Sequence, residues 1–399
     1  MSNERVLVLG GNFAGLTAAL SVKHGLGNDV DVTVVSKSDR FQFNPSFIWI
    51  PFGKRTASEV VFPLANTFES HGVEFIHGEA TKIDPQSQTV ETSRGAFDYD
   101  YLVIATGYLN DFEVVPGLGP GGNAYSITHL DGAIDAAEGW ARFLNDPGPV
   151  VVGATQGAAC FGAAYEFVFN VAYHLKRHKL KVPVAYVSAE PFPGHFGIGG
   201  LPGGEKLLGM FLKRQKIEGI FDVAMEEVLP GEIRLSDART LPFRYAMVVP
   251  PFVGAEVVKA SGLGNAKAFI EVKDTYQTLS YPNVYAVGIA TAVNAPWQSA
   301  NAVGVPKTGF PAETMARVAA ENVTAQIRGE PPSKEENFGD IPAVCIMDAG
   351  NNGVVILADR MLPPRKHGVM IPGPQSHAAK LAFEKYFLWK ARHGYVKLP

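Results

Sequence analysis

Residues 5–9, RVLVL, run directly into residues 10–15, GGNFAG, and an Ala- and Leu-rich stretch follows from Leu16 to His24. This order predicts a strand, a tight turn and a helix. Residues 30–35, VDVTVV, predict a second strand, which completes a unit whose helix N-terminus points free N–H groups at a pyrophosphate. The pattern therefore predicts a dinucleotide-binding turn made of small residues, namely Gly10, Gly11, Asn12, Ala14 and Gly15.

The fingerprint of this turn is imperfect at two places. Asn12 stands where the middle glycine is usual. Asn tolerates the left-handed conformation better than most residues, so we expect the turn to survive. Ser36, and not an acid, ends the second strand, so Ser36 or Lys37 is expected to meet a ribose by a weaker contact than a carboxylate gives.

Composition limits the class of protein. A chain of 399 residues is long enough for roughly two to three domains. With 46% hydrophobic and 19% charged residues it is neither disordered nor collagenous nor a coiled coil, and a net charge of −4 makes nucleic acid an unexpected partner. No apolar run reaches 18 residues and no Sec signal precedes the first strand, so we expect no transmembrane helix. No metal site is expected.

Two later segments read as buried strands that end in small residues. Residues 99–107, YDYLVIATG, end in Ala105, Thr106 and Gly107, and residues 283–288, NVYAVG, end in Gly288. Both resemble strands of flavoproteins with two dinucleotide folds. The resemblance implies FAD and an α/β fold of two Rossmann-like domains. The FAD domain would be discontinuous, with residues 1–115 and 275–330, around a second domain of residues 116–274, and residues 331–399 would form a C-terminal region.

A second strand and turn occurs at residues 150–159, VVVGATQGAA. Thr155 replaces the glycine that lets a pyrophosphate approach the backbone, which argues against NAD(P)H binding there. Glu190, which follows the strand expected from Val184 to Ser188, argues the other way because an acid at this place could hold a ribose.

The chain has two cysteines, Cys160 and Cys345, which cannot form a disulfide framework for so long a chain. Cys160 lies among small residues near the start of an expected helix, where the helix dipole favours a thiolate. The alternative is a pair of buried core thiols.

The residues around the cysteines resemble sulfide:quinone oxidoreductases, and the similarity spans nearly the whole chain. It is carried by residues 157–166, residues 190–200, residues 304–311, the strand around Cys345 and the tail from Phe383 to Lys390. In that family two cysteines face each other across the flavin and carry sulfur, and Cys160 and Cys345 match them. The resemblance implies that hydrogen sulfide is oxidised to polysulfide or elemental sulfur and that FAD passes the electrons to a membrane quinone.

The chain departs from the family pattern at Thr128, which replaces a third cysteine found in many members. Thr cannot carry sulfur, so any role of that cysteine is lost. The related flavocytochrome c sulfide dehydrogenases tether FAD through a cysteine that residues 41–45, FQFNP, lack. We therefore expect noncovalent FAD.

Three further residues are candidates for the reaction. Glu166 could relay a proton from a thiol or sulfide, or it could be a carboxylate paired with a Lys or Arg. Lys307 matches the family lysine beside the flavin pyrimidine edge, and its alternative is a solvated surface lysine. His195 is a candidate proton carrier, or a histidine hydrogen-bonded to its loop backbone.

The tail is basic and aromatic. From Arg365 to Lys397 it has one acid, Glu384, and an expected helix carries Phe383, Phe387 and Trp389. Such a helix suits the surface of an anionic bilayer, and the alternative is a helix docked on its own core. A quinone would reach the flavin past this tail and Met347. The expected location is peripheral on a prokaryotic inner membrane, and a homo-oligomer is compatible with the sequence.

Three other functions stay open. A type II NADH:quinone dehydrogenase shares the fold but needs a sound NADH turn and no cysteine pair. A nonenzymatic flavin-binding subunit would bind FAD without being reduced by sulfide. A sulfide dehydrogenase with a cytochrome c acceptor would differ in its acceptor and in membrane partition.

Overall fold

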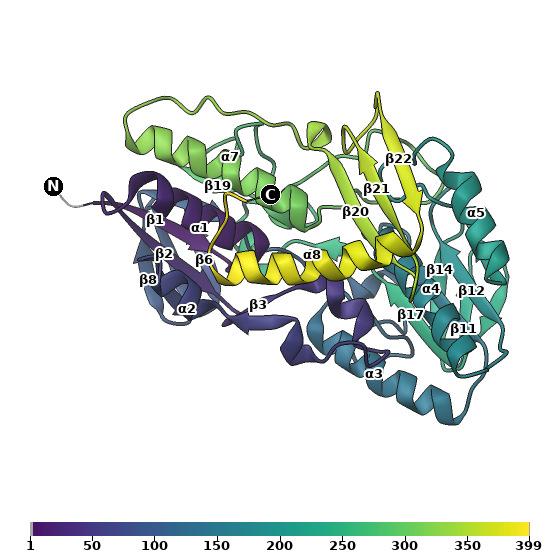
Figure 1. Cartoon of the computed structure of the whole chain (residues 1–399). Helices are drawn as coiled ribbons and strands as arrows, with labels where there is room; N and C mark the ends of the chain where they lie inside the picture. Colours follow the sequence, from purple (N-terminus) through teal and green to yellow (C-terminus); the bar gives the residue numbers. More distant parts are fainter. Residues whose placement is uncertain (1–2, 399) are drawn as a thin grey trace.

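The computed structural model describes residues 3–398 and contains two parallel sheets (Figure 1). The first has the strand order β19-β9-β1-β2-β5, and every neighbouring pair is parallel. Its strands are β1 (Glu4–Leu9), β2 (Val30–Ser36), β5 (Glu74–His77), β9 (Tyr101–Ile104) and β19 (Val284–Ala286). Since β19 pairs with β9, this sheet joins the first hundred residues to a segment far along the chain.

The second parallel sheet has the order β13-β12-β11-β17. Its strands are β11 (Val150–Ala154), β12 (Val184–Ser188), β13 (Ile217–Ile220) and β17 (Tyr245–Val249). Two parallel sheets with helical connections are typical of two Rossmann-like dinucleotide-binding domains, so the α/β prediction is confirmed. The larger helices are α1 (Phe13–Leu26), α3 (Leu130–Asn145), α4 (Phe161–Arg177), α5 (Gly204–Arg214) and α7 (Gly309–Ile327).

Shorter elements connect the sheets. The short helices are α2 (Leu64–Glu69) and α6 (Glu256–Ala260), with 3-10 turns η1 (Asn44–Trp49), η2 (Ala57–Glu59), η3 (Phe112–Val114), η4 (Gly288–Ala290) and η5 (Phe338–Asp340). The short strands are β3 (Arg40–Gln42), β4 (Val61–Pro63), β6 (Ala80–Asp84), β7 (Thr89–Thr92), β8 (Gly95–Asp98), β10 (Leu109–Asn110), β14 (Met225–Leu229), β15 (Glu232–Leu235), β16 (Thr240–Pro242) and β18 (Phe252–Val253).

The C-terminal region is an antiparallel sheet with a helix across it. The strands β20 (Ala343–Asp348), β21 (Gly353–Ala358) and β22 (Gly368–Pro372) pair in that order. The helix α8 (Pro374–Arg392) packs on β20 and β21 and then runs toward α1 in Figure 1. Because side chains alternate along a strand, Cys345 and Met347 lie on one face of β20, and Val344 and Ile346 lie on the other.

The helix α8 is buried through its charged side chains, which corrects the expectation of an apolar face turned to a membrane. Its buried residues are Ser376, Lys380, Glu384, Phe387, Lys390 and Ala391, a stripe at helical spacing. Three of them pair with charges elsewhere: Lys380 with Glu166 at 3.0 Å, Glu384 with Arg55 at 2.7 Å and Lys390 with Glu313 at 2.8 Å. Lys380 and Lys390 are therefore not part of a solvated basic surface.

The aromatic residues of α8 divide between the core and the surface. Phe387 is buried, and its ring centroid lies 5.0 Å from that of Phe13 and 5.2 Å from that of Phe43. Phe383 packs against the same cluster, 5.7 Å from Phe387. Trp389, in contrast, is 46% exposed. The alternative of a docked helix therefore describes Phe383 and Phe387, whereas Trp389 and Tyr386 lie at the surface of the protein. Within residues 3–398 no helix is long and apolar enough to cross a bilayer.

Candidate active site

The first dinucleotide turn is closed by tight backbone contacts. Gly10 has a φ of +102°, and a Cβ at this position would lie 2.3 Å from the carbonyl oxygen of Ala105. A Cβ at Gly15 would lie 1.8 Å from the carbonyl oxygen of Gly10. Glycine is therefore required at both positions.

Asn12 does not need the left-handed conformation that we expected of it, because its φ is −86°. Its side chain instead holds the strand β3 beside the turn. The Oδ1 atom accepts a hydrogen bond from the amide of Gln42 at 3.1 Å, and Nδ2 donates to the carbonyl of Gln42 at 3.2 Å.

The surroundings of the turn fit a bound dinucleotide. The helix α1 begins without a side-chain cap and without an acid in its first turn, which leaves its N–H groups open to a phosphate. The buried hydroxyl of Thr106 has no hydrogen-bond partner within residues 3–398. Gly107 borders open space, and a Cβ at Gly288 would lie 3.0 Å from the Cβ of Ala14. A bound dinucleotide would give the Thr106 hydroxyl a hydrogen-bond partner. The small residues beside α1 would let the dinucleotide come close to the backbone.

Ser36 and Lys37 differ in their relation to the turn. Ser36 lies beside it, since its Oγ would be 3.3 Å from a Cβ at Gly11, and this hydroxyl donates to the carbonyl of Ser38 at 2.8 Å. Lys37 is exposed and pairs with Glu79 at 2.7 Å. Of the two, only Ser36 is shown next to the turn.

Lys307 is buried, so it is not the solvated surface lysine of the alternative interpretation. Its ammonium donates to the carbonyl of Ile289 at 2.9 Å and to that of Thr291, and it lies 3.9 Å from the ring centroid of Phe269. Burial lowers its pKa to about 7. None of the residues in the described range 3–398 gives it a carboxylate partner, so an anion placed beside it would be stabilised.

The second dinucleotide turn is filled by the chain itself. The amide of Gly157 donates to the carbonyl of Ala302 at 2.6 Å, and the amide of Gly304 donates to the carbonyl of Ala158 at 2.9 Å. The amide of Thr155 donates to Val249 at 3.1 Å. Residues 302–304 therefore pack against the turn, and the backbone groups of Thr155, Gly157 and Ala158 named here are paired within the chain.

Glu190 does not present a carboxylate to a ribose, contrary to the alternative raised by its position. It is fully buried, and it accepts hydrogen bonds from the Ser188 hydroxyl at 2.8 Å and from the amide of Phe196 at 2.6 Å. Burial raises its pKa to about 7. This side chain holds the loop after β12 in place.

The two cysteines come from different elements. Cys160 precedes the first turn of α4, and Cys345 lies in the middle of β20. Neither is in a disulfide in this structure. Burial raises the pKa of Cys160, although the amide of Ala163 opposes it, so the expected thiolate is not favoured by the helix alone. Cys345 keeps accessible surface, yet the protein around it raises the pKa of its thiol to about 12.

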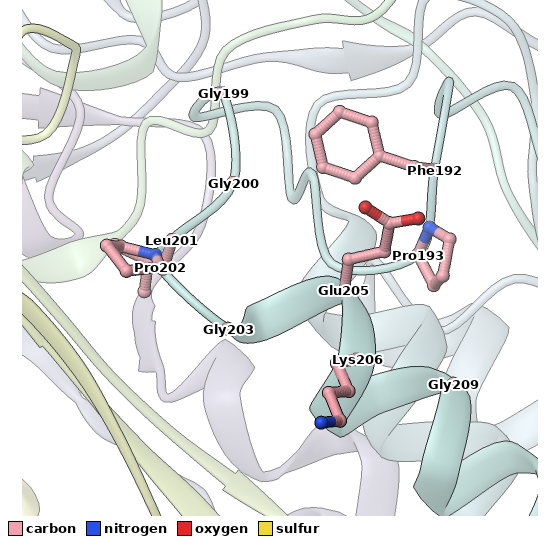
Figure 2. A pocket seen from close by; sticks show the side chains of 10 residues that line it. All are labelled: Phe192, Pro193, Gly199, Gly200, Leu201, Pro202, Gly203, Glu205, Lys206 and Gly209. Carbon is pink, nitrogen blue, oxygen red and sulfur yellow. The ribbon is translucent and has the colours of Figure 1, made fainter.

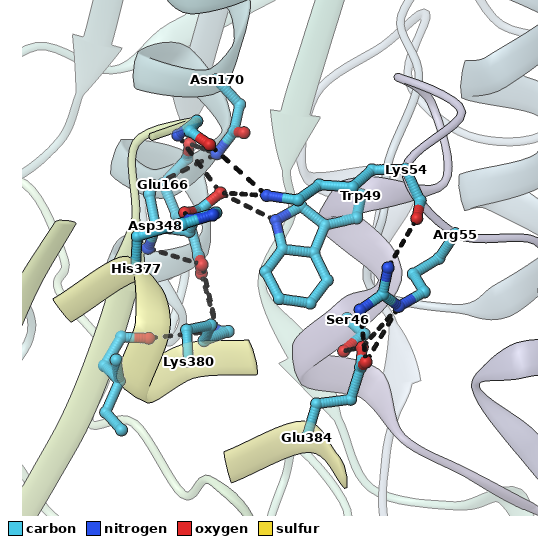
Figure 3. A network of polar contacts seen from close by, with 12 residues as sticks. Ser46, Trp49, Lys54, Arg55, Glu166, Asn170, Asp348, His377, Lys380 and Glu384 are labelled. Atoms are coloured by element: carbon cyan, nitrogen blue, oxygen red, sulfur yellow. Dashed lines mark hydrogen bonds and ion pairs between the residues drawn. The ribbon is translucent and has the colours of Figure 1, made fainter. Parts of the chain in front are cut away.

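A buried polar network (Figure 3) joins α4, the helix that follows Cys160, to β20, the strand that carries Cys345. Glu166 accepts hydrogen bonds from Lys380 at 3.0 Å and from the amide of Asp348 at 2.8 Å. Burial raises the pKa of Glu166 to about 7, while Lys380 pulls it down. The carboxylate of Asp348 in turn accepts from the indole of Trp49 at 2.8 Å and contacts His377. The paired-carboxylate interpretation of Glu166 is confirmed, and its role in proton transfer stays a prediction.

Sequence reasoning missed most of this network. The basic composition of the tail does not indicate that Lys380 is buried, and the sequence gives no reason to connect Trp49, Asp348 and His377 with one another. Cys345 and Asp348 lie three residues apart on the strand β20. This short spacing is the one local feature that connects the network with a cysteine. Met347, between them, is buried on β20 and lies 3.9 Å from where a Cβ of Gly162 would be, so it stands beside the start of α4.

His195 makes its contacts in a glycine-rich loop. Its Nδ1 accepts from the amide of Gly197 at 3.3 Å, and its ring is edge-on to Trp297 at 4.8 Å. The same loop and the start of α5 enclose a cavity of about 660 Å³ between Phe192, Gly200 and Glu205 (Figure 2). This cavity contains neither cysteine, so its size does not identify the reactive centre.

Burial lowers the pKa of His195 to about 4, so this histidine is expected to stay neutral above pH 5.5. In the unfolded chain the imidazole of His195 takes up a proton near pH 6.5, whereas in the folded protein it does so only near pH 4. The free energy of unfolding therefore decreases as the pH falls from about 6.5 toward 4. The test is the chemical shift of its ring protons against pH by NMR, assigned by their loss in His195→Asn. A midpoint above pH 6 would contradict the prediction.

Comparisons with known proteins agree with this geometry. The family model of the pyridine nucleotide-disulphide oxidoreductases matches residues 4–304. The sulfide-quinone reductase of Aquifex aeolicus is 34% identical over 98% of this chain and 92% of its own length, and the mouse mitochondrial sulfide:quinone oxidoreductase is 26% identical over 79% and 72%. A type II NADH:quinone oxidoreductase of Staphylococcus haemolyticus is 30% identical, but over only 29% of each chain.

Among solved structures, the crystal structure of the Aquifex aeolicus sulfide:quinone oxidoreductase superposes with a TM-score of 0.93 over 98% of this chain and 92% of that one, at 34% identity. The match therefore includes the C-terminal region as well as both parallel sheets. The chain belongs to the pyridine nucleotide-disulphide oxidoreductases and, within them, to the sulfide:quinone oxidoreductase family.

Proposed function

We propose that this enzyme oxidises hydrogen sulfide to polysulfide or elemental sulfur through Cys160 and Cys345 and FAD, and passes the electrons to a membrane quinone. The observation that carries the proposal is the position of the two thiols. Cys160 directly precedes α4 and Cys345 lies on β20, and the buried Glu166 and Lys380 pair joins these two elements through hydrogen bonds to the amide of Asp348 and the carbonyl of Ile346. The names of the full-length relatives support sulfide and quinone as the substrates.

The residue types suit this chemistry. Hydrosulfide is a soft nucleophile that can attack a sulfur bridging the two cysteines, and one cysteine then leaves as a thiolate. Glu166, whose pKa is raised to about 7, can take up a proton from hydrogen sulfide or a thiol and release it again near neutral pH. FAD, when bound, supplies the acceptor for two electrons. Further attack on the persulfide would lengthen the sulfur chain until it leaves.

FAD would be held without a covalent bond by the first turn. The residues proposed for it are Gly10, Gly11, Asn12, Ala14, Gly15, Ser36, Ala105, Thr106, Gly107, Gly288 and Lys307, with Lys37 as a more distant candidate. The pairing of β19 with β9 supports a discontinuous FAD domain of residues 1–115 and 275–330, with residues 116–274 and 331–399 as the other units. Lys307 would stabilise negative charge on the reduced cofactor.

The filled second turn favours this proposal over a type II NADH:quinone dehydrogenase. An NADH pyrophosphate would have to displace residues 302–304 and break the hydrogen bonds of Gly157 and Gly304. Glu190 is buried and cannot reach a ribose without releasing the loop at Phe196.

For the membrane, we propose that the exposed end of α8 makes the contact. Trp389 stacks near Tyr395 and His393, with ring centroids 5.1 and 5.5 Å away, and Tyr395 is also 46% exposed. Aromatic rings with neighbouring basic residues are typical of the membrane interface. Met347, Phe383 and Phe387 would line the path of the quinone from there. A cytochrome c acceptor is the alternative, and it requires no membrane contact.

Gly15→Ala is expected to abolish flavin binding, because the added Cβ would lie 1.8 Å from the carbonyl oxygen of Gly10. The matched control is Gly209→Ala in α5, where a Cβ meets nothing within 4 Å. The measurement is the ratio of flavin to protein absorbance after purification. Equal flavin content in the two variants would contradict the proposed cofactor site.

Replacing Trp389 and Tyr395 together by Ala should reduce binding to vesicles that contain anionic lipid by roughly tenfold. Met210→Ala, which removes a comparably exposed side chain on α5, should leave binding unchanged. Co-sedimentation with vesicles measures both. Unchanged binding of the double variant would show that the contact lies elsewhere or that a soluble acceptor is used.

The function itself is tested by adding sulfide, and separately NADH, to the anaerobic flavoprotein and then a short-chain quinone. Sulfide should bleach the flavin and quinone should restore it, whereas NADH should do neither. Cys160→Ser and Cys345→Ser should slow bleaching by at least about 100-fold, the scale of losing a nucleophile.

Each other result selects an alternative. Bleaching by NADH alone would assign the chain to the type II dehydrogenases. Bound FAD that neither donor reduces would indicate a nonenzymatic flavin-binding subunit. Sulfide bleaching followed by reoxidation only with cytochrome c would replace quinone as the acceptor.

A further inference from the structure

The helix α8 places one cation in the buried space between α4 and β20. The ammonium of Lys380 donates to the Glu166 carboxylate at 3.0 and 3.2 Å and to the carbonyl of Ile346 at 3.1 Å. Its side chain is only 5% exposed. In Figure 3 it points from α8 into the polar network, toward Glu166. Its position is therefore fixed by both elements that carry the cysteines.

The environments of the two thiols differ. Cys160 has a local donor, the amide of Ala163 in the first turn of α4. Cys345 lies on a strand and has no helix end, but it is next in sequence to Ile346, whose carbonyl binds Lys380. Lys380 is the strongest influence opposing burial at Cys345, and at Cys160 it comes after Ala163. The cation therefore contacts the backbone directly beside Cys345, and it opposes the rise in the pKa of that thiol.

We propose that the Lys380 ammonium stabilises the Cys345 thiolate and so makes Cys345 the sulfur released in the first step of sulfide oxidation. This rests on the proposed function. Hydrosulfide attacks the Cys160 sulfur of a disulfide between Cys160 and Cys345. A bond forms between the hydrosulfide sulfur and Cys160, the bond between the two cysteines breaks, and its electron pair stays on Cys345. Cys160 becomes a persulfide, so the hydrosulfide sulfur is oxidised as the disulfide is reduced, with one negative charge before and after.

Other charges face Lys380 from every element around it. Glu166 comes from α4, Cys160 directly precedes that helix, and Cys345 and Asp348 come from β20. Lys54 and His377 both pair with Asp348, and the ring of Trp49 in η1 lies 6.0 Å from the Lys380 ammonium. Glu166 opposes the effect of Lys380 on Cys345, because a carboxylate disfavours a nearby thiolate. Removing Lys380 and removing the charge of Glu166 should therefore shift Cys345 in opposite directions.

The test uses the reactivity of Cys345 and not enzyme turnover. In reduced flavoprotein carrying Cys160→Ser, alkylation of Cys345 by iodoacetamide is followed from pH 7.5 to 10 by mass spectrometry of the peptide. Adding Lys380→Met should slow alkylation at a fixed pH about tenfold, which is one unit in the thiol pKa. Lys380→Arg should keep the rate within about threefold, and Glu166→Gln should increase it.

The matched control is Lys390→Met, which removes another buried lysine of α8 whose partner is Glu313. It should leave the alkylation of Cys345 unchanged. The proposal fails if Lys380→Met alkylates at the parent rate, if Lys390→Met slows the reaction equally, or if Glu166→Gln and Lys380→Met shift it in the same direction. If Lys380→Met does not fold, Lys380→Arg and Glu166→Gln still decide whether positive charge beside Cys345 increases its rate of alkylation.

The outcome is separable from that of the proposed function. A Lys380 effect on Cys345 in a protein that sulfide does not bleach would overturn the function and leave the thiolate assignment standing. Bleaching by sulfide with no effect of Lys380 would support the proposed function and overturn the thiolate assignment.

Discussion

Buried charges must be paired, and three such pairs attach α8 to the rest of the chain. Lys380 binds Glu166 of α4, Glu384 binds Arg55 after η1, and Lys390 binds Glu313 of α7. Removing one member of a pair of this kind costs about 3–5 kcal/mol, because the other charge is left buried alone. The helix therefore has one register on the body of the protein, and a shift by one residue would break all three pairs.

The reactive centre depends on that register. Cys345 and Asp348 lie on β20, which α8 covers, Cys160 directly precedes α4, and Glu166 lies on that helix. Hydrogen bonds from Asp348 to Glu166 and from Asn170 to Asp348 join α4 directly to β20, and α8 adds the cation of Lys380 to this contact. Burial raises the pKa of both thiols, and Lys380 opposes that rise, so the helix that closes the fold also affects the chemistry of the cysteines.

The two dinucleotide turns have similar sequence patterns, but their backbone and side-chain groups have different partners in the folded chain. The first keeps open donors at α1 and an unpartnered Thr106 hydroxyl. In the second, the amide of Gly157 donates to Ala302, the carbonyl of Ala158 accepts from Gly304, and Glu190 accepts from the amide of Phe196. Internal hydrogen bonds at the second turn leave its strand and helix intact, because the sheet is stabilised by its own ladder and core.

The sequence by itself determined the two strand–turn–helix units, the strands at residues 5–9 and 30–35, a strand within residues 99–107, and the two cysteines as the features to explain. Apolar runs and glycine turns act over a few residues, so these could be read locally. The tertiary structure alone decided that Lys380 and Lys390 are buried, that Phe387 faces the core, and that Trp49 meets Asp348. Charge and hydrophobicity in the tail predicted a helix on a membrane surface, but its buried residues are bound by partners as distant in sequence as Ser46 is from Glu384. Pairing between residues far apart in the chain leaves no local periodicity, so only the folded chain reveals it.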